Sequence, residues 1–356
     1  MQSKTVICHD SFNILGGGET LSLFLSDILS ADLLYGFIDK KFYPYLKDYD
    51  YNFLLNYTLP EILQRIISIR KFQTKDYCKK YKNIIYTGNY SVFNATLNKN
   101  SNKIYYCYSP PKFAFPISKD YLKSQKKMNH FVSRLFKKLY INEYYKSLNN
   151  CNKIISISYE CKNRLKKFLD IDSEVVYPPV DSNRFLNLGD DDFYLSTSRL
   201  EKYKNIDVAI KAFKKLKDKK LIVTNTGSDE KRLKKIAGNS DNILFTGVVS
   251  SKKLRELVGK CSGLIYLSSD EDFGLSVIES MSAKKVIICN NSGSFKELIK
   301  NGENGILIEL NYLDLIQSIK NLNNTYVDYL SYNSYKSLDK FSKYNFENSI
   351  NKILIR

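Results

Sequence analysis

The sequence contains few of the residues that build metal centres and disulfide frameworks. Its 356 residues include two histidines, seven cysteines and no tryptophan. No two cysteines have the Cys-x-x-Cys spacing of a zinc or redox motif, and their number is odd. We therefore expect neither a histidine-rich metal site nor a disulfide framework, and the cysteines favour reduced thiols in a cytoplasmic compartment.

Long apolar runs are absent as well. No stretch reaches the roughly 20 residues that a membrane-spanning helix requires. The N-terminus enters a strand-like segment at residues 5–8 without the pattern of a signal peptide. We expect a cytoplasmic protein. If a membrane is involved, the chain lies on its cytoplasmic face as a peripheral protein.

Acidic residues are fewer than basic ones, which gives a net charge of +18. Residues 1–180 contain 27 Lys and Arg against 15 Asp and Glu, so they carry +12 of this charge. A basic surface can attract nucleic acid, anionic lipid or a phosphorylated substrate, or it can simply be solvated. Two basic, aromatic-rich stretches, 61–82 and 119–148, are expected to be helices. They can lie on an anionic membrane, or merely cover the sheet of their domain.

The pattern of the chain predicts two α/β domains. Its length exceeds the usual size of one domain. Between residues 193 and 322, six short apolar segments alternate with amphipathic ones, which predicts βαβ units and a parallel sheet with helices on both faces. The first half begins in the same way, with a strand, a glycine loop at 16–18 and a helix at 19–29. We predict domains at 1–180 and 181–340, and a C-terminal helix at 341–356 that packs back toward the first domain.

The clearest binding chemistry follows the strand predicted at 263–267. The segment reads Ser268-Ser269-Asp270-Glu271-Asp272-Phe273-Gly274-Leu275, with a helix expected to begin near 273–274. The unpaired amides at a helix start favour an anion such as a diphosphate. Glu271 precedes this helix and Glu279 lies roughly a turn and a half into it, so each can accept hydroxyl hydrogen bonds on one side of the anion. Alternatively, the helix dipole alone favours acidic residues at these positions.

Two further elements accompany this segment. Arg199 and Lys204 follow the strand predicted at 193–196, where they can hold phosphate or be solvated. Gly16-Gly17-Gly18 follows the first strand and permits close approach of a ligand to the backbone, or forms a plain turn. The glycines match neither the Gly-x-Gly-x-x-Gly nor the Walker pattern, so they do not indicate NAD binding or ATP hydrolysis.

In this order and spacing, the three elements resemble glycosyltransferase family 4, retaining enzymes of the GT-B fold. The resemblance extends through residues 106–111, 176–185 and 293–297, and is closest to the O-antigen mannosyltransferase branch. It implies two Rossmann-like doubly wound parallel-sheet domains facing a central cleft. It also implies a hexosyltransferase with a nucleotide-sugar donor, GDP-mannose first and UDP-glucose second. The implied acceptor is an oligosaccharide or a lipid-linked glycan.

The resemblance also assigns roles to individual residues. Arg199 and Lys204 would neutralise the donor diphosphate, Glu271 would bind the sugar and Glu279 the ribose. The implied donor-binding residues are Gly17, Gly18, Val248, Phe273, Gly274, Leu275 and Glu279. Relatives often have a histidine where this chain has Tyr108, so Tyr108 and His9 are the candidates for the acceptor side of the cleft. Because Arg199, Lys204 and the helix start can stabilise the leaving phosphate, we expect no metal and no cofactor.

Other classes of function stay open. A basic nucleic-acid-binding protein would bind DNA or RNA with an affinity that falls steeply with salt, but no recognition motif supports it, and we expect no nucleic-acid partner. A protein that binds nucleotide-sugar without transferring it would also fit, because Tyr108 replaces the family histidine. For the enzyme, we expect same-face attack through an oxocarbenium-like state, since the predicted turns offer no carboxylate nucleophile.

Overall fold

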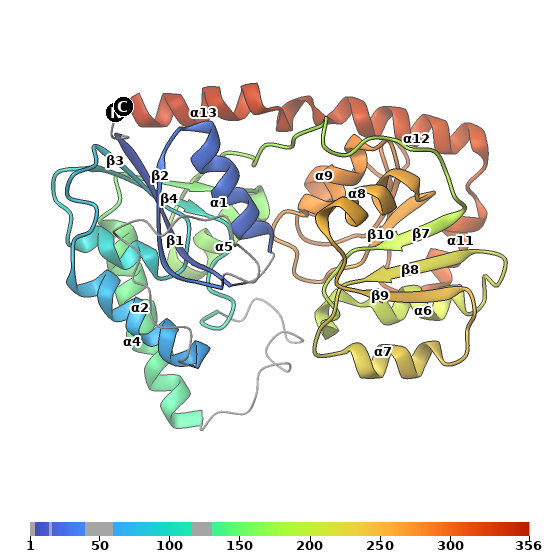
Figure 1. Cartoon of the computed structure of the whole chain (residues 1–356), viewed down its shortest axis with the longest axis horizontal. Coiled ribbons are helices and arrows are strands. Elements are labelled where there is room, and N and C mark those ends of the chain that lie inside the picture. The colour runs from blue at the N-terminus through green and yellow to red at the C-terminus, as the bar shows by residue number, and fades with distance from the viewer. Residues whose placement is uncertain (1–3, 14–15, 40–59, 116–129, 356) are drawn as a thin grey trace. The chain divides into compact units, whose positions relative to one another are not determined.

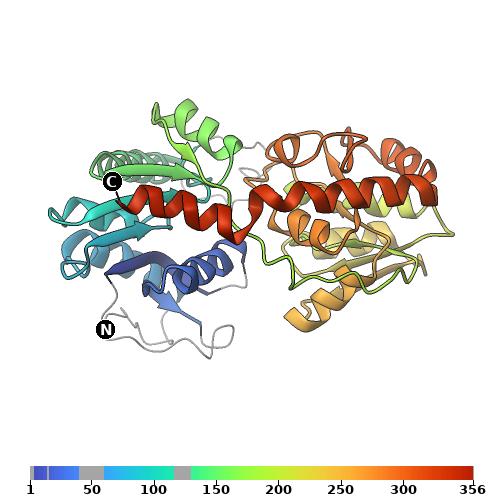
Figure 2. The same cartoon turned by 90° about the horizontal axis from the view of Figure 1, so that it is seen from above.

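The computed structural model describes residues 4–13, 16–39, 60–115 and 130–355. They form two compact units. The first comprises the described residues up to 178 together with 347–355, and the second comprises residues 179–346. Each unit is built on one six-stranded parallel sheet with helices on both faces (Figures 1 and 2). The predicted fold class, two doubly wound parallel sheets, is confirmed.

The first unit contains the following strands and helices. Its strands are β1 (Thr5–Phe12), β2 (Asp32–Ile38), β3 (Asn83–Tyr86), β4 (Asn102–Cys107), β5 (Lys153–Ser156) and β6 (Glu174–Val175). Its helices are α1 (Gly17–Ile28), α2 (Glu61–Thr74), the 3-10 helix η1 (Ser91–Thr96), α4 (His130–Asn149) and α5 (Tyr159–Leu169). The sheet order is β2-β1-β3-β4-β5-β6. The direction in which strands are added therefore reverses between β1 and β3.

Two local predictions for this unit differ from the structure, and a third is tested only in part. Gly17 and Gly18 form the first turn of α1 instead of a loop. The helix expected at 61–82 ends at Thr74, because Asn94 Nδ2 donates to the Lys75 carbonyl oxygen at 2.7 Å and holds the chain as it leaves α2. The helix expected at 119–148 is described only from His130, and residues 119–129 lie outside the described residues.

The second unit contains the six strand–helix pairs that the sequence predicts. Its strands are β7 (Phe193–Ser196), β8 (Lys220–Thr224), β9 (Ile243–Gly247), β10 (Gly263–Tyr266), β11 (Val286–Asn290) and β12 (Ile306–Ile308). Helices η2 (Lys202–Lys204), α6 (Ile206–Phe213), α7 (Glu230–Ala237), α8 (Ser251–Lys260) and α9 (Leu275–Ser282) follow the first four of these strands. The chain then forms α10 (Phe295–Leu298), α11 (Tyr312–Lys320), α12 (Asn324–Lys336), η3 (Ser337–Phe341) and α13 (Lys343–Ile355).

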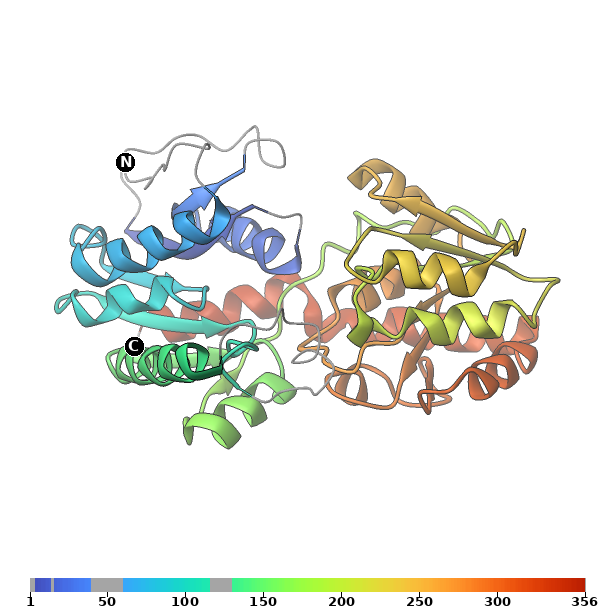
Figure 3. The same ribbon diagram turned by 90° about the horizontal axis from the view of Figure 1, so that it is seen from below.

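The order of the second sheet is β12-β11-β10-β7-β8-β9. Its central strands are buried on both faces, which is why they read as continuous apolar runs in the sequence. From below, α6 and α7 cover one face of this sheet, and α2 and α4 cover one face of the first sheet (Figure 3). The reversal in strand order falls between β7 and β10, so the loops after these two strands border the place where doubly wound sheets bind ligands.

The polar segment before β7 belongs to the second unit. Leu188 N donates to the Gly259 carbonyl at 2.7 Å, and the buried Lys285 ammonium donates to the Gly189 carbonyl at 2.6 Å. These bonds hold residues 187–191 against α8 and the start of β11. Within the described part of the chain, no helix combines the length and the hydrophobicity needed to cross a bilayer.

Candidate functional site

The loops after β7 and β10 bring Lys204 and Glu271 together. Lys204 Nζ lies 2.7 Å from Glu271 Oε2 and donates to Ser268 Oγ at 3.2 Å. Both side chains are largely buried, with exposed fractions of 10% for Lys204 and 16% for Glu271. The pair therefore lies at the switch point of the second sheet, at the carboxyl ends of its central strands.

Asn205 ties these two loops to each other. Its Nδ2 atom donates to the Leu267 carbonyl at 3.1 Å and to Ser269 Oγ at 2.7 Å, both in the loop after β10. Its φ of 50° is left-handed, a conformation that asparagine adopts more readily than most residues other than glycine. Asn205 thus makes the left-handed backbone turn and adds hydrogen bonds across the switch point.

The environment of Lys204 keeps its ammonium charged. Burial by itself would lower the pKa of Lys204, but the adjacent Glu271 carboxylate raises it above the usual value. The rings of Tyr203 and Tyr266 lie 5.4 and 5.3 Å from Nζ, within the range of cation–π attraction. Burial also raises the pKa of Tyr266 to about 12, so this phenol is neutral. The result is a preformed cation beside a carboxylate in surroundings of low polarity.

Helix α9 begins directly after this pair. Gly274 precedes it with a φ of 97°, and the first residue of the helix is Leu275, slightly later than predicted. Ser294 Oγ donates to the Phe273 carbonyl at 3.0 Å, and the Phe273 ring packs against Phe341 with centroids 5.6 Å apart. Because glycine has no side chain, Gly274 provides no cap for the first amides of α9, which are left for a ligand or solvent.

Glu279 is the fifth residue of α9. Burial raises its pKa to about 7, and the positive charge of Arg184 offsets part of this rise. Arg184 is exposed and comes from the polar segment before β7. Our sequence reasoning did not select Arg184, although it lies within the resembling segment 176–185 and its charge complements that of Glu279.

Two residues that were predicted to bind the donor, Arg199 and Val248, make fewer contacts with the Lys204–Glu271 pair. Arg199 is exposed after β7, and its Nη2 donates to Tyr203 Oη at a long 3.3 Å. Val248 is 59% exposed and follows the edge strand β9, which β8 separates from β7. The fold therefore places Arg199 beside the Lys204–Glu271 pair through Tyr203, whereas it does not bring Val248 next to the pair.

The first unit gathers a second polar cluster around its own switch point. His9 Nδ1 lies 2.9 Å from Thr87 Oγ1 and 3.1 Å from Ser22 Oγ. Ser22 Oγ in turn lies 3.1 Å from Thr87 Oγ1 and 3.2 Å from Tyr108 Oη. The structure thus joins His9 and Tyr108, as their shared assignment to the acceptor side requires. Sequence reasoning missed Ser22 and Thr87, although Thr87 directly follows the strand that pairs with β1.

Gly18 of α1 lies over this cluster. A Cβ atom on Gly18 would lie 3.5 Å from the Tyr108 ring and 4.0 Å from His9 Cε1, while Gly17 begins the helix. Burial lowers the pKa of His9 to about 3 and raises the pKa of Tyr108 above its usual value. Both rings are therefore neutral near pH 7.

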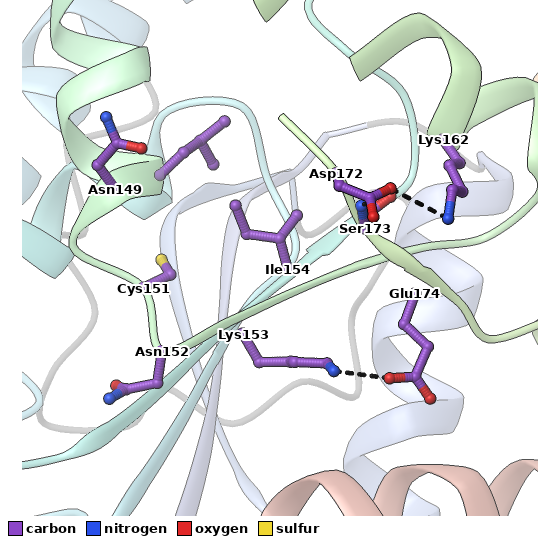
Figure 4. A pocket seen from close by; sticks show the side chains of 10 residues that line it. Asn149, Cys151, Asn152, Lys153, Ile154, Lys162, Asp172, Ser173 and Glu174 are labelled. Atoms are coloured by element: carbon purple, nitrogen blue, oxygen red, sulfur yellow. Dashed lines mark hydrogen bonds and ion pairs between the residues drawn. The ribbon is translucent and has the colours of Figure 1, made fainter. Parts of the chain in front are cut away.

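A hollow of about 570 Å³ lies elsewhere in the first unit, around the beginning of β5. Figure 4 shows Lys153 pointing toward Glu174 and Lys162 toward Asp172, with ion-pair distances of 2.7 and 3.0 Å. The cluster of His9 and Tyr108 lies at the carboxyl ends of β1, β3 and β4, so the hollow is not part of the candidate site. Among the residues that the structure describes, no group of three His, Cys, Asp or Glu side chains is placed to hold a metal ion.

Comparison with known proteins finds a family that the second unit resembles. Residues 181–337 match the family model "Glycosyl transferases group 1". An uncharacterized glycosyltransferase of Methanocaldococcus jannaschii is 30% identical over 164 residues, which cover 46% of each chain. The O-antigen chain mannosyltransferase RfbU of Salmonella typhimurium is 26% identical over 183 residues, which cover 49% of this chain and 52% of the relative. The chain thus spans about half the length of these curated relatives.

A solved structure extends the likeness to both units. The Anabaena protein HepE, in complex with UDP and glucose, superimposes with a TM-score of 0.75 over 99% of each chain, at 16% sequence identity. At this identity the superposition establishes the fold. The expected resemblance to GT-B glycosyltransferases is confirmed. Residues 181–337 are thus similar to the glycosyl transferases group 1, and the fold of the two units is that of the GT-B glycosyltransferases.

Proposed function

We propose that this chain transfers a hexose, with retention, from a nucleotide-sugar to a hydroxyl of an oligosaccharide or lipid-linked glycan. The observation that carries the proposal is the buried Lys204–Glu271 pair at the switch point of the second sheet, next to the start of α9. A diphosphate can replace the carboxylate as the partner of Lys204. The released Glu271 carboxylate can then accept hydrogen bonds from sugar hydroxyls.

Each polar group of the second unit then has a role in binding the donor. Lys204 and Arg199 bind the diphosphate, together with the amides of Gly274 and Leu275. Glu279 accepts hydrogen bonds from the ribose hydroxyls. As the sugar leaves, negative charge grows on the terminal phosphate, and the fixed positive groups around it stabilise that charge without reorganising.

His9 and Tyr108 are neutral, and this limits which group can accept the proton that the acceptor hydroxyl loses. The bond from the sugar carbon to the phosphate oxygen breaks, a bond to the acceptor oxygen forms on the same face, and the acceptor hydroxyl loses its proton. The low pKa of His9 and the high pKa of Tyr108 make both poor proton acceptors near pH 7. The leaving phosphate oxygen is the group in this scheme that can take the proton.

The donor we favour is GDP-mannose, because a mannosyltransferase is among the relatives of the chain. UDP-glucose is the second candidate, because the similar Anabaena protein was also solved in complex with UDP-glucose. Thermal unfolding in the presence of each nucleotide-sugar distinguishes them. A ligand at about 100 times its Kd stabilises the folded state by about 2.7 kcal/mol, so the true donor raises the Tm at the lowest concentration.

Transfer itself is tested with radiolabelled donors and a crude lipid-oligosaccharide acceptor. We expect transfer by the wild type and none by Glu271→Ala or Lys204→Ala. A wild type that binds the donor but transfers no label would instead be a non-catalytic nucleotide-sugar-binding protein. Binding of nucleic acid without any nucleotide-sugar binding would overturn the proposal.

The exposed side chains of α2 and α4 suggest that the protein binds its acceptor at a membrane surface. Both helices pack on η1, and they expose Leu63 and Ile66 on α2 and Phe136 and Leu139 on α4. Exposed basic side chains, among them Arg65, Arg70 and Lys138, accompany these apolar ones. We propose that this surface, the α2–α4 face, binds the anionic cytoplasmic side of a membrane, where a lipid-linked acceptor is available.

A further inference from the structure

Two hydroxyl groups, those of Ser22 and Thr87, connect the Tyr108 hydroxyl with His9 in the first unit. Tyr108 Oη lies 3.2 Å from Ser22 Oγ, Ser22 Oγ lies 3.1 Å from Thr87 Oγ1, and Thr87 Oγ1 lies 2.9 Å from His9 Nδ1. These residues come from β1, α1 and the ends of β3 and β4. A hydroxyl has a single proton to donate, so the direction of each hydrogen bond depends on the others.

The backbone around Thr87 determines that direction. The Cys8 carbonyl oxygen already accepts from Thr87 N at 2.9 Å and from Ser91 Oγ at 3.1 Å, which occupies its two lone pairs. The Thr87 hydroxyl lies 3.3 Å from that carbonyl but only 2.9 Å from His9 Nδ1. Donation to His9 is the shorter of these two hydrogen bonds, and it requires the proton of the neutral imidazole to be on Nε2.

The remaining hydrogen bonds follow from this one. Ser22 Oγ also lies 3.1 Å from His9 Nδ1, but the single lone pair of that nitrogen already accepts from Thr87 at 2.9 Å. Ser22 therefore donates to the Thr87 oxygen and in turn accepts from Tyr108. The phenol proton of Tyr108 is thus directed into the protein, and a lone pair of its oxygen is left for a ligand. Tyr108 is partly exposed, as this role requires.

We propose that His9, Thr87 and Ser22 form a directed hydrogen-bond chain that orients Tyr108 so that its oxygen accepts a hydrogen bond from the incoming hydroxyl of the acceptor. This inference rests on the proposed transfer function. His9, Thr87 and Ser22 are positioning residues, and Tyr108 is the residue that touches the acceptor. No proton moves along the chain, because its members stay neutral and the acceptor proton leaves with the phosphate.

Ring-nitrogen NMR of protein labelled with ¹⁵N-histidine tests the hydrogen-bond chain directly, without an activity measurement. His130 is the second of the two histidines, so His130→Gln leaves one signal set. We expect a protonated Nε2 and an unprotonated Nδ1, with no titration between about pH 5 and pH 8. The double variant Thr87→Val/Ser22→Ala, which removes both hydroxyls next to Nδ1, should abolish this preference, and Thr87→Ser should retain it. A proton on Nδ1, or an imidazole that becomes charged in this range, overturns the proposal.

Transfer kinetics test whether the hydrogen-bond chain helps to bind the acceptor. Thr87→Val and Ser22→Ala should raise the KM for the acceptor or lower transfer by about tenfold, the effect of losing one hydrogen bond. Donor affinity and the slow hydrolysis of the donor by water should not change, and Thr87→Ser should restore transfer. Equal losses in Thr87→Val and Thr87→Ser, or a parallel loss of donor affinity, show a merely structural role and overturn the proposal. A wild type that binds no nucleotide-sugar overturns the proposed function and this acceptor role with it, and the NMR measurement still decides whether the directed chain exists.

Discussion

Lys204 Nζ and Glu271 Oε2 lie 2.7 Å apart, although 67 residues separate them in the sequence. The resemblance to family 4 glycosyltransferases implies that Lys204 binds the diphosphate and Glu271 the sugar. Their contact means that each side chain neutralises the other before a donor arrives. Such a buried pair is sensitive to the loss of one partner, because the remaining charge has no compensation. The first prediction therefore compares the loss of one partner with the loss of both.

Lys204→Met should lower the free energy of unfolding by about 3 kcal/mol, since it leaves the Glu271 carboxylate buried without its partner. The double variant Lys204→Met/Glu271→Gln should recover much of this loss without recovering donor binding. Urea unfolding measures both. As a control, Lys211→Met breaks the more exposed pair with Asp207 and should cost no more than about 1 kcal/mol. Equal costs in the two single variants would contradict the argument.

Donor affinity should depend on pH through Glu279, whose pKa is about 7. As the pH falls below 7 the carboxylate is protonated and accepts ribose hydrogen bonds less well, so affinity should decrease by roughly tenfold. Titration calorimetry between pH 6 and 8 measures it. Glu279→Gln should bind weakly with a flat pH profile over this range.

The same group makes an opposite prediction for stability without ligand. Burial raises the pKa of Glu279 from 4.5, so the folded protein holds this proton more tightly than the unfolded chain does. Protonated Glu279 therefore adds to the free energy of unfolding fully below pH 4.5, and this added stability is lost as the pH rises to about 7. The Glu279→Gln variant should lack this part of the pH dependence. The difference in free energy of unfolding between variant and wild type is the quantity to compare.

Gly274→Ala should reduce both stability and donor affinity. Gly274 has a φ of 97°, and a Cβ there would lie 3.3 Å from Phe295 Cε1, which disturbs the start of α9. Gly189 is a matched control, because its φ is 100° but a Cβ would have no neighbour within 4 Å. We expect each variant to lose about 1 kcal/mol through backbone strain. Only Gly274→Ala should bind the donor more weakly, and a similar loss of affinity in Gly189→Ala would argue against the site.

The α2–α4 face should bind vesicles that contain anionic lipid. Flotation should succeed at low salt and weaken at moderate salt, because screening reduces the attraction of the basic side chains. Phe136→Ser/Leu139→Ser should reduce flotation by removing apolar contact. Leu313→Ser is the control, since Leu313 is as exposed as Leu139, at 61%, but lies on α11 of the second unit. If the wild type does not bind the anionic vesicles, the membrane proposal is wrong.

Chelation tests the expectation of metal independence. Asp270 and Asp272 have the spacing of an Asp-x-Asp pair next to Glu271, so a divalent cation bound with the donor is a concrete alternative. We expect transfer in EDTA to stay within about twofold of transfer in Mg²⁺, since the positive groups of the protein stabilise the leaving phosphate. A loss that only added Mg²⁺ or Mn²⁺ reverses would show that the cation takes part.

The sequence alone was sufficient for what depends on neighbouring residues. Apolar segments spaced by amphipathic ones predict the six strand–helix pairs between residues 193 and 322, because helix and strand periods are local properties. The segment from Glu271 to Glu279 likewise carries its loop, its helix start and its two carboxylates in a single run. The left-handed turn at Asn205 also has a local basis, since asparagine tolerates this backbone conformation better than most residues other than glycine.

Only the tertiary structure decided which side chains meet. Tyr108 reaches Ser22 across 86 residues and His9 meets Thr87 across 78, because parallel strands place distant loops at the same edge of a sheet. The end of α2 at Thr74 depends on Asn94, which is 19 residues beyond the carbonyl that it binds. Strand order and register set these contacts through packing of the whole sheet. A local pattern of hydrophobicity is the same for every order in which its strands could be arranged.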